Sequence, residues 1–282
     1  MIQFFNVNYV YNKGTQLETV ALNKIDKTIT ENEFIGIIGH TGSGKSTLIQ
    51  LMNRLEKPTG GRILYNGEDI SKRSYNIRKL RKNVGVVFQY PEYQLFGQTV
   101  IDDVCFGLKT STMGDKEKKE RAIEVLKLVG ISEKDYLKSP FELSGGNRKR
   151  VAIAGTLIME PDILILDEPT AALDPVGRIE LQHLIGSIYD KGNITVIWIS
   201  HDMNEIAKVA KRIIVMNDGE VILDGDTIEV FSDIRTLEKY GLKAPEIIYV
   251  AEELKKRGLN INLSELSAEG LAASIKQYVG VI

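Results

Sequence analysis

The chain has 282 residues, 43% of them hydrophobic and 26% charged, which is ordinary for a soluble globular protein with one large domain or one domain and an appendage. Its formal net charge of −2 argues against a general binder of polyanions. The single cysteine, Cys105, excludes an intramolecular disulfide and favours a reducing compartment.

The chain shows no signal for insertion into a membrane. Its first residues lack the basic start and the long apolar core of a signal peptide. The most apolar runs, 34–39 and 194–199, are far shorter than the roughly 18 residues that span a bilayer. We therefore expect that any work at a membrane goes through a partner.

Short β-branched runs alternate with longer helical patterns, which predicts an α/β fold with a mostly parallel sheet. Asn-Gly and Asp-Gly pairs inside two further apolar runs predict hairpins, and these add an antiparallel portion. The predicted core strands are residues 34–38, 84–88, 163–166 and 194–199, and the predicted hairpins are 62–70 and 213–223.

Two regions have helical character. Between about 90 and 157, one apolar helical face predicts a helical subdomain, with Ala122, Val125, Leu126 and Val129 on it. After about 227 the chain is helical again. Two apolar stripes follow there, Ile247, Val250, Ala251 and Leu254 in the first and Leu271, Ile275 and Tyr278 in the second. Such stripes pack either on the chain's own core or on another subunit, and the sequence leaves both open.

Residues 39–47, GHTGSGKST, fit G-x-x-x-x-G-K-[ST] and follow a predicted strand directly. The continuation is a predicted helix, so the motif has the context it requires. We expect the backbone N–H groups of this loop to cradle phosphates, Lys45 to reach the terminal ones and the Ser46 hydroxyl to bind Mg²⁺. The nucleotide-binding candidates are Gly39, His40, Thr41, Gly42, Ser43, Gly44, Lys45, Ser46 and Thr47.

Three other predicted strands end in polar residues: Gln89, the pair Asp167 and Glu168, and His201. Ligands of such sheets bind at the carboxyl ends of the strands, so these residues are expected on the same edge as Gly39. A carboxylate pair at a buried strand end is costly unless a cation or a proton offsets it. We therefore expect Asp167 to bind the metal and Glu168 to act as general base.

A second anion site is predicted at 142–150, ELSGGNRKR. Ser144, Gly145 and Gly146 are expected to open a helix, where unpaired N–H groups and the helix dipole attract an anion. The chain thus has two predicted anion sites, and the question is whether both bind the same nucleotide.

Two other classes of nucleotide-binding protein would explain part of this pattern. A GTPase would explain NKID at 23–26 and DPVG at 174–177, but in GTPases both motifs follow the phosphate loop, with NKID-like sequences last. Here NKID precedes the loop, so both matches are interpreted as coincidence. A small-molecule kinase would explain the phosphate loop but not the second anion site.

Together the motifs resemble those of the ATPase subunits of ABC transporters, over residues 1 to about 225. GHTGSGKS resembles Walker A, ILILDE Walker B, LSGGN the LSGGQ signature, and AALD, with Asp174, the D-loop. Gln89 stands at the Q-loop position and His201 at that of the switch histidine. The resemblance implies a P-loop ABC ATPase core at 1–227 with a helical signature subdomain. It leaves a helical C-terminal extension at 228–282, which is a candidate for dimerisation.

The resemblance also implies how the two anion sites are used. Two cassettes meet head to tail, and each ATP lies between the Walker motifs of one and Ser144, Gly145, Gly146 and Asn147 of the other. Ser46, Gln89 and Asp167 would hold Mg²⁺, and Gln89, Glu168 and His201 would be catalytic. Tyr11, or alternatively Tyr9, would stack on adenine. Asn147 departs from the family's Gln and is one methylene shorter, but it keeps the amide and leaves the backbone donors at Ser144 to Gly146 unchanged, so we expect the site to work.

Within the family, FQYPEYQLF at 88–96 and HTGSGKSTLIQ at 40–50 resemble energy-coupling factor transporters. DEPTA after Walker B resembles the second of their two ATPase subunits. This implies ATP hydrolysis that powers uptake of vitamins or metal ions, a partner ATPase in a heterodimer, a transmembrane T-component and substrate-binding S-components. It also implies a peripheral place on the cytoplasmic side of the cell membrane.

Three alternatives stay open. The chain could serve another ABC transporter, or it could be a soluble ABC ATPase that acts on nucleic acid or ribosomes. The basic run at 72–82 hints at the latter, although a solvated helix face explains it more simply, and we expect no nucleic-acid partner. A regulatory module without turnover is disfavoured by Glu168. The transported substrate does not follow from this chain, which is not expected to touch it.

Overall fold

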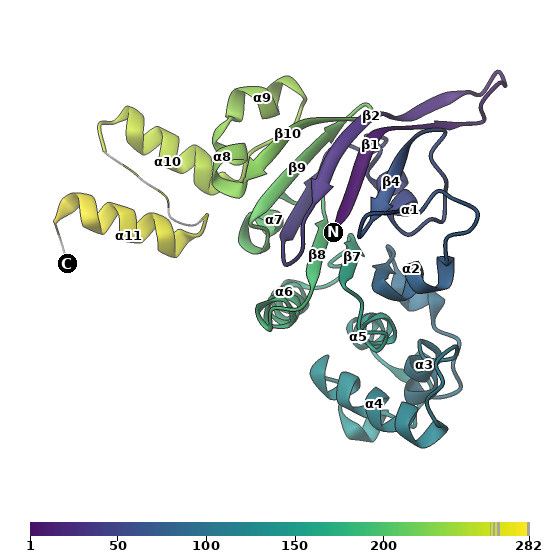
Figure 1. Ribbon diagram of the computed structural model, residues 1–282. Helices are drawn as coiled ribbons and strands as arrows, with labels where there is room; N and C mark the ends of the chain where they lie inside the picture. The colour runs from purple at the N-terminus through teal and green to yellow at the C-terminus, as the bar shows by residue number, and fades with distance from the viewer. Residues whose placement is uncertain (260, 262, 264–265, 281–282) are drawn as a thin grey trace.

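The computed structural model describes residues 1–259, 261, 263 and 266–280. In this part of the chain the strands form two sheets, a four-stranded one in the order β2-β1-β4-β5 and a six-stranded one in the order β10-β9-β3-β8-β7-β6 (Figure 1). The strands are β1 (Ile2–Tyr11), β2 (Thr19–Ile29), β3 (Phe34–Ile38), β4 (Gly60–Tyr65), β5 (Glu68–Asp69), β6 (Val84–Val87), β7 (Ile163–Asp167), β8 (Thr195–Ile199), β9 (Arg212–Asn217) and β10 (Glu220–Asp226).

The larger sheet is parallel from β9 through β3, β8 and β7 to β6, and β10 is antiparallel at its edge. Its strands are nearly continuous apolar runs, because helices and the other sheet cover both faces. Successive residues point to opposite faces. In β7, Leu164 and Leu166 pack toward the helices, while Ile163 and Ile165 pack toward the smaller sheet. All four predicted core strands are confirmed.

The smaller sheet is antiparallel, as predicted, but most of it was missed. Residues Asn66 and Gly67, between β4 and β5 of this sheet, and Asp218 and Gly219, between β9 and β10 of the larger sheet, all have positive φ, from 47° to 81°, which suits tight hairpins. The long strands β1 and β2 were not predicted. Their register shifts between Phe4 and Val7 and again before Tyr9. These irregularities interrupt the two-residue period by which a strand is predicted.

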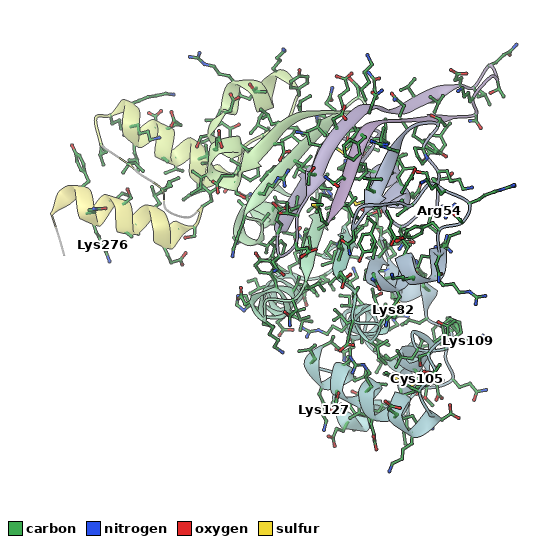
Figure 2. All side chains as sticks on the ribbon, viewed as in Figure 1. Arg54, Lys82, Cys105, Lys109, Lys127 and Lys276 are labelled. Atoms are coloured by element: carbon green, nitrogen blue, oxygen red, sulfur yellow. The ribbon has the colours of Figure 1, made fainter. Side chains whose placement is uncertain are left out.

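Helices cover the larger sheet and form two outlying groups (Figure 1). The predicted subdomain consists of α3, α4 and α5, and its predicted face at Ala122, Val125, Leu126 and Val129 is buried. The basic run at 72–82 leads into α2, where Leu80 is buried and Lys82 points outward (Figure 2). The helices before the C-terminal group are α1 (Lys45–Met52), α2 (Ile77–Asn83), α3 (Val100–Phe106), α4 (Asp115–Leu128), α5 (Gly145–Leu157), α6 (Pro175–Asp190) and α7 (Met203–Val209).

The C-terminal helices divide into two pairs. They are α8 (Thr227–Ser232), α9 (Ile234–Lys239), α10 (Glu246–Lys256) and α11 (Ala268–Val279). The pair α8 and α9 packs on the main core through Phe231 and Leu237, both fully buried. The predicted extension is therefore continuous in packing with the nucleotide-binding part at its start.

The second pair, α10 and α11, packs together at one side of the sheets (Figure 1), and α10 also joins the main core through Ile248. Ala251 and Leu271 are buried in a small cluster of their own, against Leu254 and Ile275. Most of the two predicted stripes is thus internal packing. Val250 and Tyr278 differ, with exposed fractions of 46% and 50%. The predicted extension also includes residues 260, 262, 264–265 and 281–282, which lie outside the described residues. Among the described helices, none is both long and apolar enough to cross a membrane.

Candidate functional site

The phosphate loop joins β3 to α1 and depends on glycine. Gly39, Gly42 and Gly44 have φ values of 151°, 84° and 101°, a region that other residues rarely adopt. A Cβ on Gly39 would also collide with the carbonyl oxygen of Met216. Because α1 begins at Lys45, its first backbone N–H groups lack helical partners and are available to an anion.

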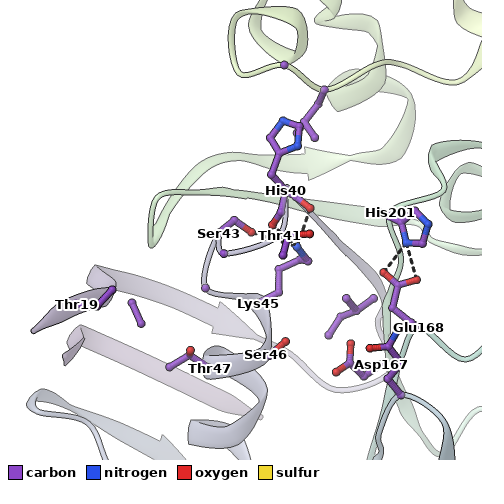
Figure 3. Close-up of a pocket in the computed structure, with 18 of the residues that line it drawn as sticks. Thr19, His40, Thr41, Ser43, Lys45, Ser46, Thr47, Asp167, Glu168 and His201 are labelled. Atoms are coloured by element: carbon purple, nitrogen blue, oxygen red, sulfur yellow. Dashed lines mark hydrogen bonds and ion pairs between the residues drawn. The ribbon is translucent and has the colours of Figure 1, made fainter. Parts of the chain in front are cut away.

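Lys45 ties this loop together (Figure 3). Its Nζ donates to the carbonyl oxygens of Gly39 and His40, each at 2.7 Å, and to the Ser43 Oγ at 3.2 Å. Burial lowers the pKa of Lys45, and the carboxylates of Glu168 and Asp167 oppose this. The ammonium group is therefore held by two carbonyl oxygens and a hydroxyl, in a partly buried site where the charges of two carboxylates favour its protonated form.

The predicted carboxylate pair ends β7 and faces the same loop (Figure 3). Burial raises the pKa of Asp167, the charge of Glu168 raises it further, and Lys45 opposes both. Glu168 has a φ of +49°, and its backbone N–H donates to the Ile199 carbonyl at 2.9 Å. A left-handed conformation at a residue other than glycine costs energy, and such residues cluster at functional sites.

Glu168 is held by His201. The Nδ1 of His201 lies 2.9 Å from both carboxylate oxygens of Glu168 (Figure 3). An ionised carboxylate only accepts hydrogen bonds, so Nδ1 carries the proton. The Glu168 side chain is 14% exposed and that of His201 is 80% exposed. The exposed His201 side chain therefore orients the largely buried carboxylate of Glu168 from the solvent side.

All the predicted Walker A, Walker B, Q-loop and switch residues meet in one cavity of 880 Å³. Its lining includes every residue from Gly39 to Thr47, with Gln89, Asp167, Glu168 and His201. Tyr11 lines it too, and the Tyr11 hydroxyl lies 3.1 Å from the Thr47 Oγ1. Tyr9 is buried, and its hydroxyl donates to Glu56. Of the two tyrosines, the geometry therefore favours Tyr11.

Sequence reasoning missed two parts of this cavity. Thr19, Val20 and Ala21 lie on β2, which pairs with β1 so that Thr19 stands opposite Tyr11. A predicted β1–β2 hairpin would have found them. The segment 241–243, which follows α9, lines another side of the cavity. Nothing local in the sequence indicates this, because the segment lies about two hundred residues from the phosphate loop.

The predicted signature residues lie elsewhere, in a separate groove of 520 Å³. Ser144 caps α5, where its Oγ accepts from the Asn147 N–H at 3.3 Å. Asp174 caps α6, where its Oδ1 accepts from the Gly177 N–H at 2.6 Å. Both helix N-termini open onto this groove. Within the described chain, no residue lines both the groove and the cavity, so one chain does not bring its two anion sites together.

A buried lysine that the sequence motifs did not indicate connects the two sides of this groove. Lys149 on α5 is 2% exposed, and its Nζ donates to the Ala171 carbonyl at 2.6 Å. Burial lowers the pKa of Lys149. The bond joins the signature helix α5 to the segment between Glu168 and Asp174. It therefore fixes the two sides of the groove, α5 and the start of α6, relative to each other.

Comparisons with known proteins agree with this geometry. A family model described as ABC transporter matches residues 22–171. The energy-coupling factor transporter ATP-binding protein EcfA2 of Caldanaerobacter subterraneus is 50% identical over 278 residues, which are 99% of this chain and 97% of that protein. The EcfA2 protein of Clostridium perfringens is 46% identical over 262 residues, 93% of this chain and 92% of that protein.

Solved structures show the same likeness. The structure of cbiO1 from Clostridium perfringens, described as part of the ABC transporter complex cbiONQ, has a TM-score of 0.75 and 40% identity, and the match covers 89% of this chain and 98% of that one. A dimeric ATP-binding cassette in a post-hydrolysis state, bound to ADP and Pi, has a TM-score of 0.71 and 32% identity, with 80% and 99% covered. The chain therefore has the P-loop ABC ATPase fold and belongs to the ABC transporter family, together with the ATP-binding proteins of energy-coupling factor transporters.

Proposed function

We propose that the chain is the ATP-binding and ATP-hydrolysing subunit of an energy-coupling factor importer and acts through membrane partners. The observation that carries this is the convergence of Lys45, Asp167 and the Glu168–His201 pair on one cavity. Near-complete matches to proteins named for that role support the transporter branch.

ATP binds in the cavity with its phosphates on the glycine loop and on Lys45, and with adenine against Tyr11. The residues fit a magnesium ion as well. The Ser46 hydroxyl, the Gln89 amide oxygen and the Asp167 carboxylate line the same cavity, and Mg²⁺ prefers oxygen ligands. Burial raises the pKa of Asp167 and so disfavours the ionised carboxylate. A bound cation would offset this cost, because a nearby positive charge favours the ionised form. The ion would neutralise charge on the phosphates.

Glu168 accepts the proton of the attacking water as general base, and His201 holds its carboxylate in position. The hydrogen bonds from Nδ1 leave the carboxylate on the cavity side of β7, and the strained backbone at Glu168 aims it there. A base that is already oriented loses little freedom in the transition state, which is how positioning contributes to rate.

Two chains complete each site. Because the groove at Ser144 and Asp174 is separate from the cavity, it serves the ATP held by another cassette, in a head-to-tail pair. The relevant pair is a heterodimer with a second ATPase subunit. The groove then covers the exposed side of the partner's γ-phosphate with helix N-termini and stabilises charge where it develops. Asn147 keeps an amide at the fifth signature position.

The membrane partners bind beside the Q-loop. Tyr93 and Phe96 follow Gln89 and are 81% and 61% exposed. Next to them is a groove of 410 Å³, lined by Phe106 of α3, by Lys109 after it and by residues of α5. Exposed aromatic residues beside a groove are typical of an interaction surface. This surface receives the T-component, and S-components bring the vitamin or metal ion, so the chain sits peripherally on the cytoplasmic side of the membrane.

The test is to purify the tagged chain from detergent-solubilised membranes, identify its partners and reconstitute the complex in vesicles. We expect a second ATPase and membrane proteins to co-purify, and ATP-dependent uptake to disappear in Lys45→Ala. Recovery of the chain with ribosomes or nucleic acid, and without membrane proteins, would favour the soluble alternative and contradict the proposal.

A further inference from the structure

The segment after α9 reaches back to the phosphate loop. Gly241, Leu242 and Lys243 line the same cavity as Lys45 and Glu168, although the rest of that lining comes from residues before 204. In Figure 3 the His40 side chain points toward this C-terminal part of the chain and away from Asp167. One side of the nucleotide cavity is therefore formed by residues outside the Walker, Q-loop and switch motifs.

His40 joins this wall to the loop. Its Nε2 lies 2.8 Å from the Tyr240 carbonyl oxygen, and since a carbonyl only accepts, Nε2 is the donor. The carbonyl of His40 itself accepts from Lys45 Nζ at 2.7 Å. Gly241 has a φ of +71°, and a Cβ there would come within 3.0 Å of the His40 Nε2. Glycine at 241 thus permits both the turn and the close approach.

Residues 241–244 are fixed in place by the main core. Leu242 and Ala244 are buried in the main core, at 5% exposure each. The backbone N–H of Leu242 donates to the Leu237 carbonyl at 2.9 Å. Lys243 lies between these two buried residues, is itself exposed, and is one of the residues that line the cavity.

The charge at Lys243 has a use in this position. Among the described residues, no carboxylate lies within ion-pair distance of its ammonium group, whereas the phosphates of a nucleotide bring several negative charges into the cavity. The resident carboxylates, Asp167 and Glu168, sit on the far side beside Lys45. A lysine is a compact point charge on a flexible stem and suits phosphate contact without a fixed angle.

We propose that Lys243 is a second phosphate-binding lysine of this site and that His40 is the positioning residue that holds its segment against the phosphate loop. The proposal rests on the nucleotide site described above. It makes the C-terminal part of the chain a component of that site, so that nucleotide binding and the placement of α9 and α10 are linked.

The experiment compares ATP, ADP and AMP binding to the full-length chain by titration calorimetry with Mg²⁺. Lys243→Ala should weaken ATP binding roughly tenfold, as expected for one charge-assisted hydrogen bond at an open site, and AMP binding much less. Lys243→Arg should retain most of the affinity. Lys208→Ala is the matched control, because Lys208 is exposed on α7 and does not line the cavity. Equal ATP affinity in Lys243→Ala and Lys208→Ala would overturn the proposal.

Two further variants separate position from charge. His40→Ala should weaken ATP binding, and its effect should largely vanish in a chain that already carries Lys243→Ala, because both act through one contact. His40→Gln should restore part of the affinity through its amide donor. Additive losses would show that His40 does not act through Lys243. If Lys45→Ala leaves ATP binding intact, the whole site is misplaced. If Lys45→Ala weakens binding and Lys243→Ala does not, only the present inference fails.

Discussion

At the scale of single residues, the structure holds Glu168, the proposed general base, in a fixed place without any bound nucleotide. Glu168 combines a left-handed backbone with two short contacts to His201. Neither feature benefits the fold, because the first costs energy and the second lies at an exposed side chain. Such local costs are typical of catalytic positions.

Glu168→Gln should lower kcat by at least ~100-fold, because the general base is lost, and leave ATP affinity within a factor of about two. The variant complex should accumulate ATP-bound closed dimers. Turnover measured alongside ATP titration checks this, with Glu124→Gln on the exposed face of α4 as the control. Normal hydrolysis by the Glu168 variant would end its assignment as the base.

Asp167 gives a prediction about pH. Burial raises its pKa in the folded chain, so folding is favoured by the protonated form and opposed by the ionised form. That stabilisation is complete below the unfolded pKa, about 3.9, and is lost as the pH rises through the folded value. Asp167→Asn imitates the neutral form. Without nucleotide it should therefore unfold a few degrees higher than the natural chain at neutral pH.

Thermal unfolding followed by circular dichroism over a range of pH checks this. The difference between Asp167→Asn and the natural chain should shrink as the pH approaches the unfolded pKa, and Glu124→Gln should show no such trend. Added Mg²⁺ and ATP should stabilise the natural chain more than the variant. A variant that is less stable at every pH would mean that Asp167 is held by favourable partners instead.

At the scale of elements, the C-terminal helices have two different tasks. The pair α8 and α9 completes the core and supports the wall of the nucleotide cavity. The pair α10 and α11 is held by its own small cluster and leaves Val250 and Tyr278 exposed. Val250 is the member of the predicted stripes that the cluster leaves out, whereas the Tyr278 hydroxyl donates to the Gly258 carbonyl at 3.1 Å and only its ring is left exposed.

If that pair contributes to dimerisation, Val250→Asp and Tyr278→Asp should weaken association between ATPase subunits by tenfold or so each, on the order of one buried contact. Val250→Asp should leave the melting temperature of the single chain unchanged, because Val250 is exposed, whereas Tyr278→Asp should lower it slightly by removing the hydrogen bond to the Gly258 carbonyl. Sedimentation velocity over a concentration series measures the association. Ala272→Asp, on the exposed side of α11, is the matched control. Unchanged association in both variants would leave dimerisation to the cassette cores.

At the scale of the whole molecule, the proposed head-to-tail pairing makes this chain half of two sites, because its cavity and its groove share no lining residue. Glu168→Gln should disable the ATP held by this chain's own Lys45. Gly146→Asp should disable the ATP held by the partner's phosphate loop, because a carboxylate there repels the γ-phosphate. A Cβ at Gly146 meets only Leu173, at an ordinary 3.7 Å, so the substitution should not disturb the fold.

Site-resolved nucleotide trapping on the reconstituted heterodimer distinguishes the two effects. Both substitutions in this chain should leave no working site, whereas Gly146→Asp combined with loss of the partner's base should damage one site. Gly186→Asp on α6, where an added Cβ meets nothing within 4 Å, is the control. If Gly146→Asp blocks closure around the ATP of its own chain, the head-to-tail arrangement is wrong.

Much of this molecule could be predicted from local patterns. Buried parallel strands are continuous apolar runs, so Ile163 to Leu166 and Thr195 to Ile199 were recognisable without any tertiary information. The residues that follow those strands must share one edge of the sheet, which placed Asp167 and His201 together. The phosphate loop is local for the same reason: its glycines and its lysine act through backbone geometry within nine residues.

Other features depend on contacts that no local pattern records. Bulges hid β1 and β2 and, with them, the side of the cavity at Thr19. The segment that contains Lys243 lies two hundred residues from the phosphate loop, and the hydrogen bond from His40 to the Tyr240 carbonyl joins the two. Only the packing of the core brings them together. The tail stripes had to be divided between internal and exposed positions, since an apolar residue on a helix has the same spacing whether its partner is in the same chain or in another. Local sequence specifies conformation and chemistry, whereas proximity between distant segments results from the packing of the whole chain.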